Sequence, residues 1–327
     1  MADQIGIIED RELINFDLDY LILGGGAVGC IFGGLLKNHG RNVQIVNKSE
    51  QSISKMNENG VQLDLNGNTI KSFPKVCCPS EALTARIVMV FTKTYQTKEA
   101  LLGILPKMHP ESTYVSLQNG LGNGKILSLT TNSRSIFHGV TMLPATLIEP
   151  GKVKSKGVNT TWFGPYESDK LHIGELILND LQKCNFDIKL VDDPNIHIWQ
   201  KACFNVALNA ISALINGSPG LIGDFGGVKN IAYELAREAI QVATKDRVKV
   251  DQKKIFNMID FVCSNHRYHK PSMLQDIQME RATEIQSLNG FIVERAKFHG
   301  IEAPSNFLIT ELIKARENAS TFWKNAP

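Results

Sequence analysis

The chain has 327 residues, of which 43% are hydrophobic and 21% are charged. This length favours two domains, because one domain usually holds roughly 150 residues, and the composition is that of a globular protein with a sizeable core. The formal net charge of +2, without a long run of Lys or Arg, argues against a nucleic-acid-binding protein, whereas a small acidic metabolite needs only one or two local cations.

The first half of the chain alternates strand-like and helix-like segments after an N-terminal extension of residues 1–17. The first strand, helix and second strand form a βαβ unit of about 30 residues, which is long enough for a crossover between parallel strands. The alternation continues and predicts a Rossmann-type, doubly wound parallel sheet over residues 18–191. The expected strands are 18–23, 42–46, 87–91 and 114–117, and the expected helices are 27–37 and 96–105.

Beyond the turn at 191–194 the strand-like segments stop and long helical patterns follow. Residues 192–327 are therefore expected to form a second, all-helical domain that carries the substrate and catalytic groups. Its amphipathic helices are also compatible with a homodimer. The expected helices are 196–214, 229–245, 252–264, 272–299 and 305–319.

A glycine-rich turn separates the first strand from the first helix. Its residues, Gly24-Gly25-Gly26-Ala27-Val28-Gly29, fit the pattern G-x-G-x-x-G of dinucleotide-binding proteins. In this pattern the first glycine allows the tight turn, the second lets the backbone approach a pyrophosphate, and the third permits close helix–strand packing. The free N–H groups of the helix would face the phosphates. A glycine turn without a ligand is the alternative, and the complete βαβ unit around the motif disfavours it.

The residues after the second strand bear on the choice between NAD and NADP. An Asp or Glu is expected there for NAD, whereas this chain has Asn47-Lys48-Ser49. Asn47 can bond the ribose and Lys48 can meet a 2′-phosphate, so NADP is favoured. The alternative for Lys48 is a solvated surface lysine.

A polar stripe is predicted on the helix that opens the second domain. Lys201, Asn205 and Asn209 are spaced at i, i+4 and i+8, which places them along one face of a helix whose other faces are apolar. Such groups are costly to bury without partners. They are therefore expected to line a polar cleft, although an exposed polar stripe is the alternative.

A further polar group follows in the same domain. Ser272 and Gln275 fit a capping box, and the same helix N-terminus would suit a substrate carboxylate. Glu284 lies among apolar residues, and it is either a functional carboxylate or a solvated helical glutamate.

Cysteine and targeting signals are weak. The six cysteines contain no CxxC pair, which favours reduced thiols and argues against a zinc site, so no metal is expected. No secretory signal is visible at the N-terminus, and no apolar stretch approaches the roughly 18 residues that span a bilayer. We therefore expect a cytoplasmic protein without a membrane partner.

Together these motifs make the chain similar to the ketopantoate reductase family, the enzymes that reduce 2-dehydropantoate to pantoate with NADPH. The resemblance covers nearly the whole chain after the N-terminal extension. It rests on GGGAVG at 24–29, FTKTYQT at 91–97, SLQNGLGN at 116–123, KACFNVALNA at 201–210 and PSMLQDIQMERATEI at 271–285. The last three are specific in combination.

The resemblance implies a role for individual residues. Lys201 matches the family's general acid, and Glu284 matches a glutamate close to the cofactor and that lysine. Asn205 and Asn209 match substrate-binding asparagines, and Ser272 matches the ligand of the substrate carboxylate. Three further positions match cofactor contacts: Lys93, Ala145, and Asn119, which also lies near the substrate.

The chain departs from the family pattern at two places. Lys48 stands where the family commonly has an arginine, and a lysine lacks bidentate geometry, which weakens the preference for NADP. The family's further substrate asparagine has Asn216 as its candidate here. The alternatives are therefore a related reductase for another small 2-oxo acid and, in a different class, a non-catalytic NADP-binding regulator.

Overall fold

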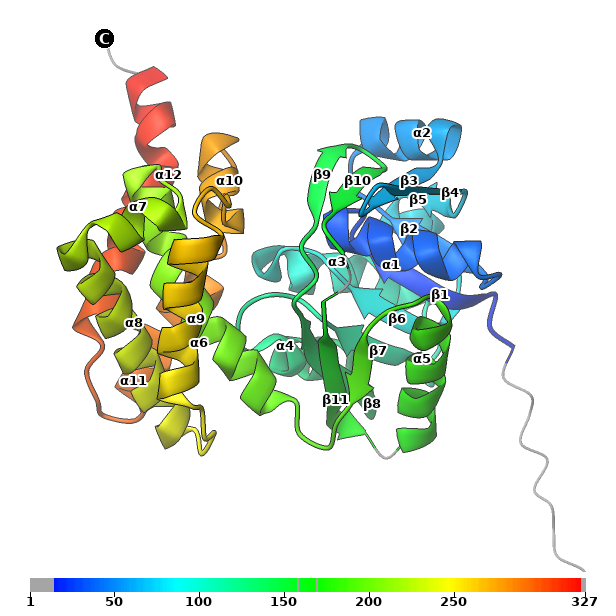
Figure 1. Cartoon of the computed structure of the whole chain (residues 1–327). Helices are drawn as coiled ribbons and strands as arrows, with labels where there is room; N and C mark the ends of the chain where they lie inside the picture. Colours follow the sequence, from blue (N-terminus) through cyan, green and yellow to red (C-terminus); the bar gives the residue numbers. More distant parts are fainter. Residues whose placement is uncertain (1–14, 158, 169, 325–327) are drawn as a thin grey trace, which may run out of the picture.

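A computed structural model describes residues 15–157, 159–168 and 170–324. Of the expected N-terminal extension, residues 1–14 lie outside the described part. The remaining chain forms an α/β part with a large sheet, followed by an all-helical part, and the two lie side by side (Figure 1). The expected fold class, a Rossmann-type sheet with a C-terminal helical domain, is confirmed.

The large sheet has eight strands in the order β12-β11-β8-β7-β6-β1-β2-β5. The strands from β8 to β5 run parallel, whereas β11 is antiparallel to β8 and β12 is parallel to β11. The bounds of β1, β2, β6 and β7 lie within two residues of the expected strands, whereas the other four strands were not predicted from the sequence. The strands are β1 (Leu18–Leu23), β2 (Val43–Val46), β5 (Lys75–Cys77), β6 (Ala85–Val90), β7 (Thr113–Ser116), β8 (Ser135–Thr141), β11 (Thr161–Ser168) and β12 (Ile188–Leu190).

Helices cover both faces of this sheet, as the doubly wound pattern requires. Side chains alternate along β1, so that Ile22 packs with the helices of one face, while Leu21 and Leu23 pack with those of the other. The first face carries α1 (Ala27–Asn38) and α5 (Leu171–Lys183), and the second carries α3 (Thr97–Ile104) and α4 (Asn123–Thr131). A further helix, α2 (Glu50–Asn59), follows β2.

A second sheet, which the sequence analysis did not predict, packs against α1. It joins the hairpin of β3 (Val61–Leu65) and β4 (Asn68–Ser72) to β10 (Lys152–Ser155) and β9 (Thr146–Glu149), in the order β4-β3-β10-β9. The close approach depends on a glycine of α1, because a Cβ at Gly34 would lie 2.9 Å from Val61 Cγ1. The sheet therefore buries the outer face of α1.

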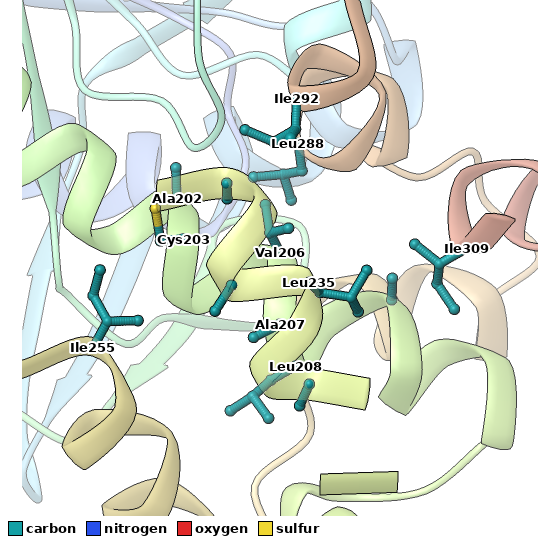
Figure 2. Packing of buried hydrophobic residues seen from close by; sticks show 14 of the residues in the cluster. Ala202, Cys203, Val206, Ala207, Leu208, Leu235, Ile255, Leu288, Ile292 and Ile309 are labelled. Atoms are coloured by element: carbon teal, nitrogen blue, oxygen red, sulfur yellow. The ribbon is translucent and has the colours of Figure 1, made fainter. Parts of the chain in front are cut away.

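The helical part is built around one long helix, α6 (Asn195–Ile215). Figure 2 shows its small and apolar side chains, among them Ala202, Val206 and Leu208, surrounded by Leu235, Ile292 and Ile309 of other helices. Those neighbours are α7 (Pro219–Asp224), α8 (Gly226–Lys245), α9 (Gln252–Asn265), α10 (Ser272–Gln278), α11 (Asn289–Phe298) and α12 (Pro304–Lys324).

The expectation that no stretch is long and apolar enough to span a bilayer is corrected by α6. With a mean hydropathy of 1.2, this helix is long and apolar enough to cross a membrane, although no stretch of that kind was expected. However, 72% of its apolar window is buried inside the protein. The central helix of a domain can be as long and as apolar as a membrane-spanning helix, and the apolar faces of α6 pack on neighbouring helices.

The single helix expected over 272–299 is wrong. α10 ends at Gln278, Glu280 takes a left-handed conformation with φ of 51°, and a short 3-10 turn, η4 (Ile285–Ser287), precedes α11. Polar contacts with the α/β part hold the intervening segment, because the main-chain N–H of Leu121 donates to the Ser287 carbonyl and Thr94 binds Glu284. These tertiary contacts outweigh the helical periodicity of the segment.

Candidate active site

The predicted cofactor and catalytic groups of the α/β part gather at one edge of the sheet. Gly24 follows β1, Asn47 follows β2, Lys93 follows β6 and Asn119 follows β7. All four strands are parallel, so their carboxyl ends meet at the same edge. This edge is where doubly wound sheets bind their ligands.

The glycine turn has the shape of a phosphate cradle. Gly24 has a φ of +114°, and a Cβ there would lie 2.8 Å from the main-chain nitrogen of Thr92. A Cβ at Gly29 would lie 2.0 Å from the Gly24 carbonyl oxygen, so only glycine fits, whereas a Cβ at Gly26 would meet nothing within 4 Å. Gly26 is also the N-cap of α1, without a side-chain cap. The first N–H groups of α1 thus have no side-chain cap, and the space beside the N-cap is open, which fits a pyrophosphate.

The end of β2 presents an amide and a cation beside this turn. Asn47 is partly buried; its Oδ1 accepts a bond from the Ser49 main-chain N–H at 3.1 Å, and its Nδ2 lies 2.8 Å from where a Cβ of Gly25 would stand. Lys48 is exposed and has no ion-pair partner among the residues that the structure describes. The donor set therefore fits a ribose together with an anionic substituent.

Lys201 is held by the α/β part although it comes from α6. Its Nζ donates to Asn119 Oδ1 at 2.6 Å and to the Thr141 carbonyl oxygen, at the end of β8, also at 2.6 Å. An ammonium has three donors, so one remains for a ligand. Burial lowers the pKa of Lys201 to about 8, and the carboxylate of Glu284 opposes that fall. The site thus holds a lysine that is protonated at neutral pH but releases its proton readily.

Two buried amides continue the line of Lys201 along α6. Asn205 and Asn209 are only 7% and 6% exposed, and within the described chain neither side chain has a hydrogen-bond partner. Neither amide belongs to the side-chain polar atoms that are buried without a partner, so the tips of both side chains still reach solvent and can be reached by a polar ligand. The alternative of an exposed polar stripe is therefore excluded, and both amides are free to bind a polar ligand.

Glu284 and Lys93 join the two parts of the protein. Glu284 is 8% exposed, and its Oε1 accepts bonds from the main-chain N–H of Thr94 at 3.1 Å and from the Thr94 hydroxyl at 3.3 Å. Its Oε2 lies 3.7 Å from Lys93 Nζ, which also donates to Asp276 Oδ2 at 2.6 Å. Burial alone would lower the pKa of Lys93, but Glu284 and Asp276 outweigh it and raise that pKa. Glu284 is therefore a bound, buried carboxylate rather than a solvated one.

Two groups of the site, Asp276 and the Thr141 carbonyl, were not predicted from the sequence. Asp276 is 2% exposed and binds Arg281 as well as Lys93. Its position between the apolar residues Leu274 and Ile277 could have indicated a buried acid. Thr141 acts through its carbonyl oxygen, and a main-chain group leaves no signal in the side-chain pattern.

The remaining predicted residues lie at the border of the site or away from it. The capping box at Ser272 is wrong: Pro271 is the N-cap of α10, the exposed Ser272 makes no cap hydrogen bond, and Gln275 Nε2 donates to the Lys270 carbonyl. A proline N-cap offers no side-chain acceptor, so the first N–H groups of α10 stay free. Ala145 is partly buried just before β9 and packs on the core of the α/β part.

Asn216 lies at the far end of α6. It is exposed, and its Oδ1 accepts a bond from Gln278 Nε2 at 2.9 Å. At 1.5 Å per residue, its 15 positions from Lys201 correspond to about 22 Å along the helix. Its side chain is thus tied to α10 and remote from Lys201.

The described residues contain no group of three or more His, Cys, Asp or Glu side chains placed to hold a metal ion. All six cysteines are free thiols.

Comparisons with known proteins identify relatives over both parts. The family model "Ketopantoate reductase PanE/ApbA" matches residues 20–168, and the model of its C-terminal domain matches residues 195–317. A 2-dehydropantoate 2-reductase of Pyrococcus horikoshii is 32% identical over 298 residues, which cover 91% of this chain and 97% of that protein. The enzyme of that name from Streptococcus pyogenes is 28% identical over 299 residues, 90% of this chain and 97% of that one.

Solved structures agree in fold. A D-mandelate dehydrogenase in complex with NADH and anilino(oxo)acetate has a TM-score of 0.87 at 25% identity and covers 92% of this chain and 98% of that one. A ketopantoate reductase of Ralstonia eutropha has a TM-score of 0.86 at 24% identity, with 92% and 99% covered. Because the family models match most of the chain, from the glycine turn to the last helix, this protein belongs to the ketopantoate reductase family, which consists of oxidoreductases that use a nicotinamide cofactor and a small-molecule substrate.

Proposed function

We propose that this protein reduces 2-dehydropantoate to pantoate with NADPH, a step of pantothenate biosynthesis, and that Lys201 is its general acid. The observation that carries the proposal is the Lys201 ammonium. Asn119 and Thr141 hold it at the sheet edge, and one of its three donors has no protein partner there. An ammonium in this position can bind a keto oxygen and supply its proton as negative charge develops.

The helical part supplies the groups for the rest of the substrate. Asn205 and Asn209 have unpaired amides beside Lys201, and they would bind the carbonyl and hydroxyl groups of a 2-oxo acid. The carboxylate would lie on the open N-terminus of α10 at Ser272, where a side-chain cap is absent. Each of these contacts is available only to a polar substrate.

The α/β part supplies the groups for the cofactor. Residues 24–29 would hold its pyrophosphate, and Asn47 with Lys48 its ribose and 2′-phosphate. Lys93, Asn119, Ala145 and Glu284 would line the nicotinamide end. The bound nicotinamide supplies the hydride for C2 of the substrate. Lys201 supplies the proton, and Glu284 keeps the positive charge on Lys201 favourable.

A second candidate keeps the reaction and changes the substrate and cofactor. The structurally similar D-mandelate dehydrogenase binds NADH and an aryl-substituted oxo acid analogue. In this chain Lys48 is exposed and a single point charge, so a preference for the 2′-phosphate depends on one contact. Reduction of another small 2-oxo acid with NADH is therefore the alternative.

Steady-state oxidation of NADPH and NADH separates these candidates. 2-Dehydropantoate should give the highest kcat/KM, above a branched aliphatic and an aryl 2-oxo acid, and NADPH should exceed NADH. Lys48→Ala should raise the KM for NADPH roughly tenfold and leave that for NADH unchanged, as expected for one lost ion contact to a dianion. Lys75→Ala is the matched control, because Lys75 is an exposed lysine at the opposite end of the adjacent strand β5.

Other outcomes would change the assignment. A higher kcat/KM for an aryl 2-oxo acid with NADH would select the second candidate. Cofactor binding without turnover of any 2-oxo acid would indicate a regulator instead. A homodimer and a cytoplasmic location stay predictions, which light scattering and fractionation check.

A further inference from the structure

Thr94 has no role in the function proposed above, yet its hydroxyl lies at the contact between the two parts of the protein. It is the first residue of the 3-10 turn η2 (Thr94–Gln96) after β6 and is 8% exposed. Its Oγ1 lies 3.2 Å from the Asn119 carbonyl oxygen, 3.3 Å from Asn123 Oδ1 and 3.3 Å from Glu284 Oε1. Three acceptors thus surround one hydroxyl, which has one proton to donate.

The carboxylate of Glu284 is the strongest of the three acceptors. Hydrogen bonds to an ionised acceptor are roughly twice as strong as those between neutral groups. The Asn119 carbonyl already accepts a bond from Asn123 Nδ2 at 2.9 Å. The main-chain N–H of Thr94 donates to the same Glu284 oxygen at 3.1 Å, so this oxygen lies within reach of both donors of Thr94.

We propose that Thr94 is a positioning residue, whose hydroxyl and N–H hold the Glu284 carboxylate of the helical part against the Asn119 loop that binds Lys201. The inference rests on the proposed function, because it concerns the lysine that would donate the proton. Thr94 itself touches neither Lys201 nor the place of the reacting atoms. It acts through Glu284.

Fixing Glu284 matters because two lysines compete for it. Lys93 Nζ lies 3.7 Å from Glu284 Oε2, and Glu284 also raises the pKa of Lys201 against the effect of burial. Asp276 and Arg281 lie behind Lys93 and complete the charged groups around this contact. Without the Thr94 hydroxyl, Glu284 keeps only the bond from the Thr94 main-chain N–H, so its carboxylate can turn toward Lys93, and the pKa of Lys201 falls further.

Two substitutions at Thr94 separate the hydroxyl from the shape of the side chain. Thr94→Val keeps the shape and removes the donor, so kcat should fall roughly fivefold to thirtyfold, the equivalent of one hydrogen bond to a charged group, with substrate KM within about twofold. Thr94→Ser keeps the donor and should restore kcat to near the wild-type value.

Thr97→Val is the matched control for loss of a buried hydroxyl, because Thr97 begins α3 directly after the turn η2 that holds Thr94. Thr97 is fully buried, and its Oγ1 accepts a bond from Gln118 Nε2 at 2.8 Å, with no contact to Glu284. This variant should lower the melting temperature at least as much as Thr94→Val and leave kcat near wild type. A purely structural role of Thr94 would instead make the two valine variants alike.

A second measurement does not depend on turnover. In protein labelled with [ε-¹³C]lysine, the Lys201 signal is assigned with Lys201→Met and its titration followed by NMR. In Thr94→Val it should titrate about half a pH unit lower than in wild type, because the favourable charge moves away. An unchanged titration, or an equal loss of kcat in Thr94→Ser, would overturn the inference. Wild-type protein that reduces no 2-oxo acid would refute the proposed function, while the lysine titration still decides the role of Thr94.

Discussion

The low pKa of Lys201 predicts a specific pH dependence of the reductase reaction. In the proposed function Lys201 must be protonated to donate to the keto oxygen, and burial lowers its pKa from 10.5 to about 8. That change corresponds to about 3 kcal/mol against the charged form. The kcat/KM for reduction, which reports the free enzyme, should therefore be constant below pH 7 and fall tenfold per unit well above pH 8.

The size of the fall in kcat/KM distinguishes a buried Lys201 from a lysine with an ordinary pKa. With a pKa of about 8, roughly 90% of Lys201 is protonated at pH 7 and roughly 10% at pH 9, so kcat/KM should fall about tenfold over this interval. With the ordinary pKa of 10.5, the decrease would stay below about 10%.

The assay is initial-rate NADPH oxidation with the best 2-oxo acid between pH 6 and 10, in buffers of constant ionic strength. Glu284→Gln provides the comparison, because it removes the charge that opposes the fall in pKa, so the decline should begin at a lower pH than in wild type. A wild-type profile that stays flat to pH 9.5 would refute the reasoning that burial sets the charge of Lys201.

Further substitutions test the remaining parts of the site. Lys201→Met should lower kcat by roughly 10²–10⁴. The pKa of Lys201 is lower in the folded protein than in the unfolded chain, so the unfolded chain binds the proton more tightly between pH 8 and 10.5. Over this range the free energy of unfolding of the wild type should rise by up to about 3 kcal/mol relative to that of Lys201→Met, as measured by chemical denaturation. Asn209→Leu should raise substrate KM roughly tenfold, because it removes an amide that has no hydrogen-bond partner within the described chain and is available to the substrate; an unchanged KM in steady-state assays would place the substrate elsewhere. Gly29→Ala should destabilise the fold by about 3 kcal/mol, because its Cβ would lie 2.0 Å from the Gly24 carbonyl oxygen. Gly26→Ala, where the Cβ meets nothing, should fold normally and lose NADPH affinity in calorimetry; unchanged affinity would place the pyrophosphate elsewhere.

Some of the site could be predicted from the sequence because its geometry is local. A glycine at position 24 is needed for a φ of +114°, and the glycine pattern after an apolar strand predicts that turn. Likewise, the spacing of Lys201, Asn205 and Asn209 places them on one face of a helix, wherever that helix packs in the fold. Backbone geometry alone is sufficient for both predictions.

Other features depend on residues that are distant in the chain. The second sheet pairs β3 with β10, across more than 80 residues, and the weak alternation of each short strand did not predict it. The break after Gln278 likewise follows from contacts of Glu284 and Ser287 with the α/β part, which helical periodicity does not encode.

The sequence by itself therefore determined the dinucleotide fold, the glycine turn and the polar face of α6, since each follows from interactions between residues close in the chain. Only the tertiary structure decided that Lys201 binds Asn119 and the Thr141 carbonyl, and that Glu284 stands beside Thr94. It also decided the pKa of Lys201. The physical reason is that burial and charge pairing depend on which segments pack together, and these segments lie 60 to 190 residues apart in the chain.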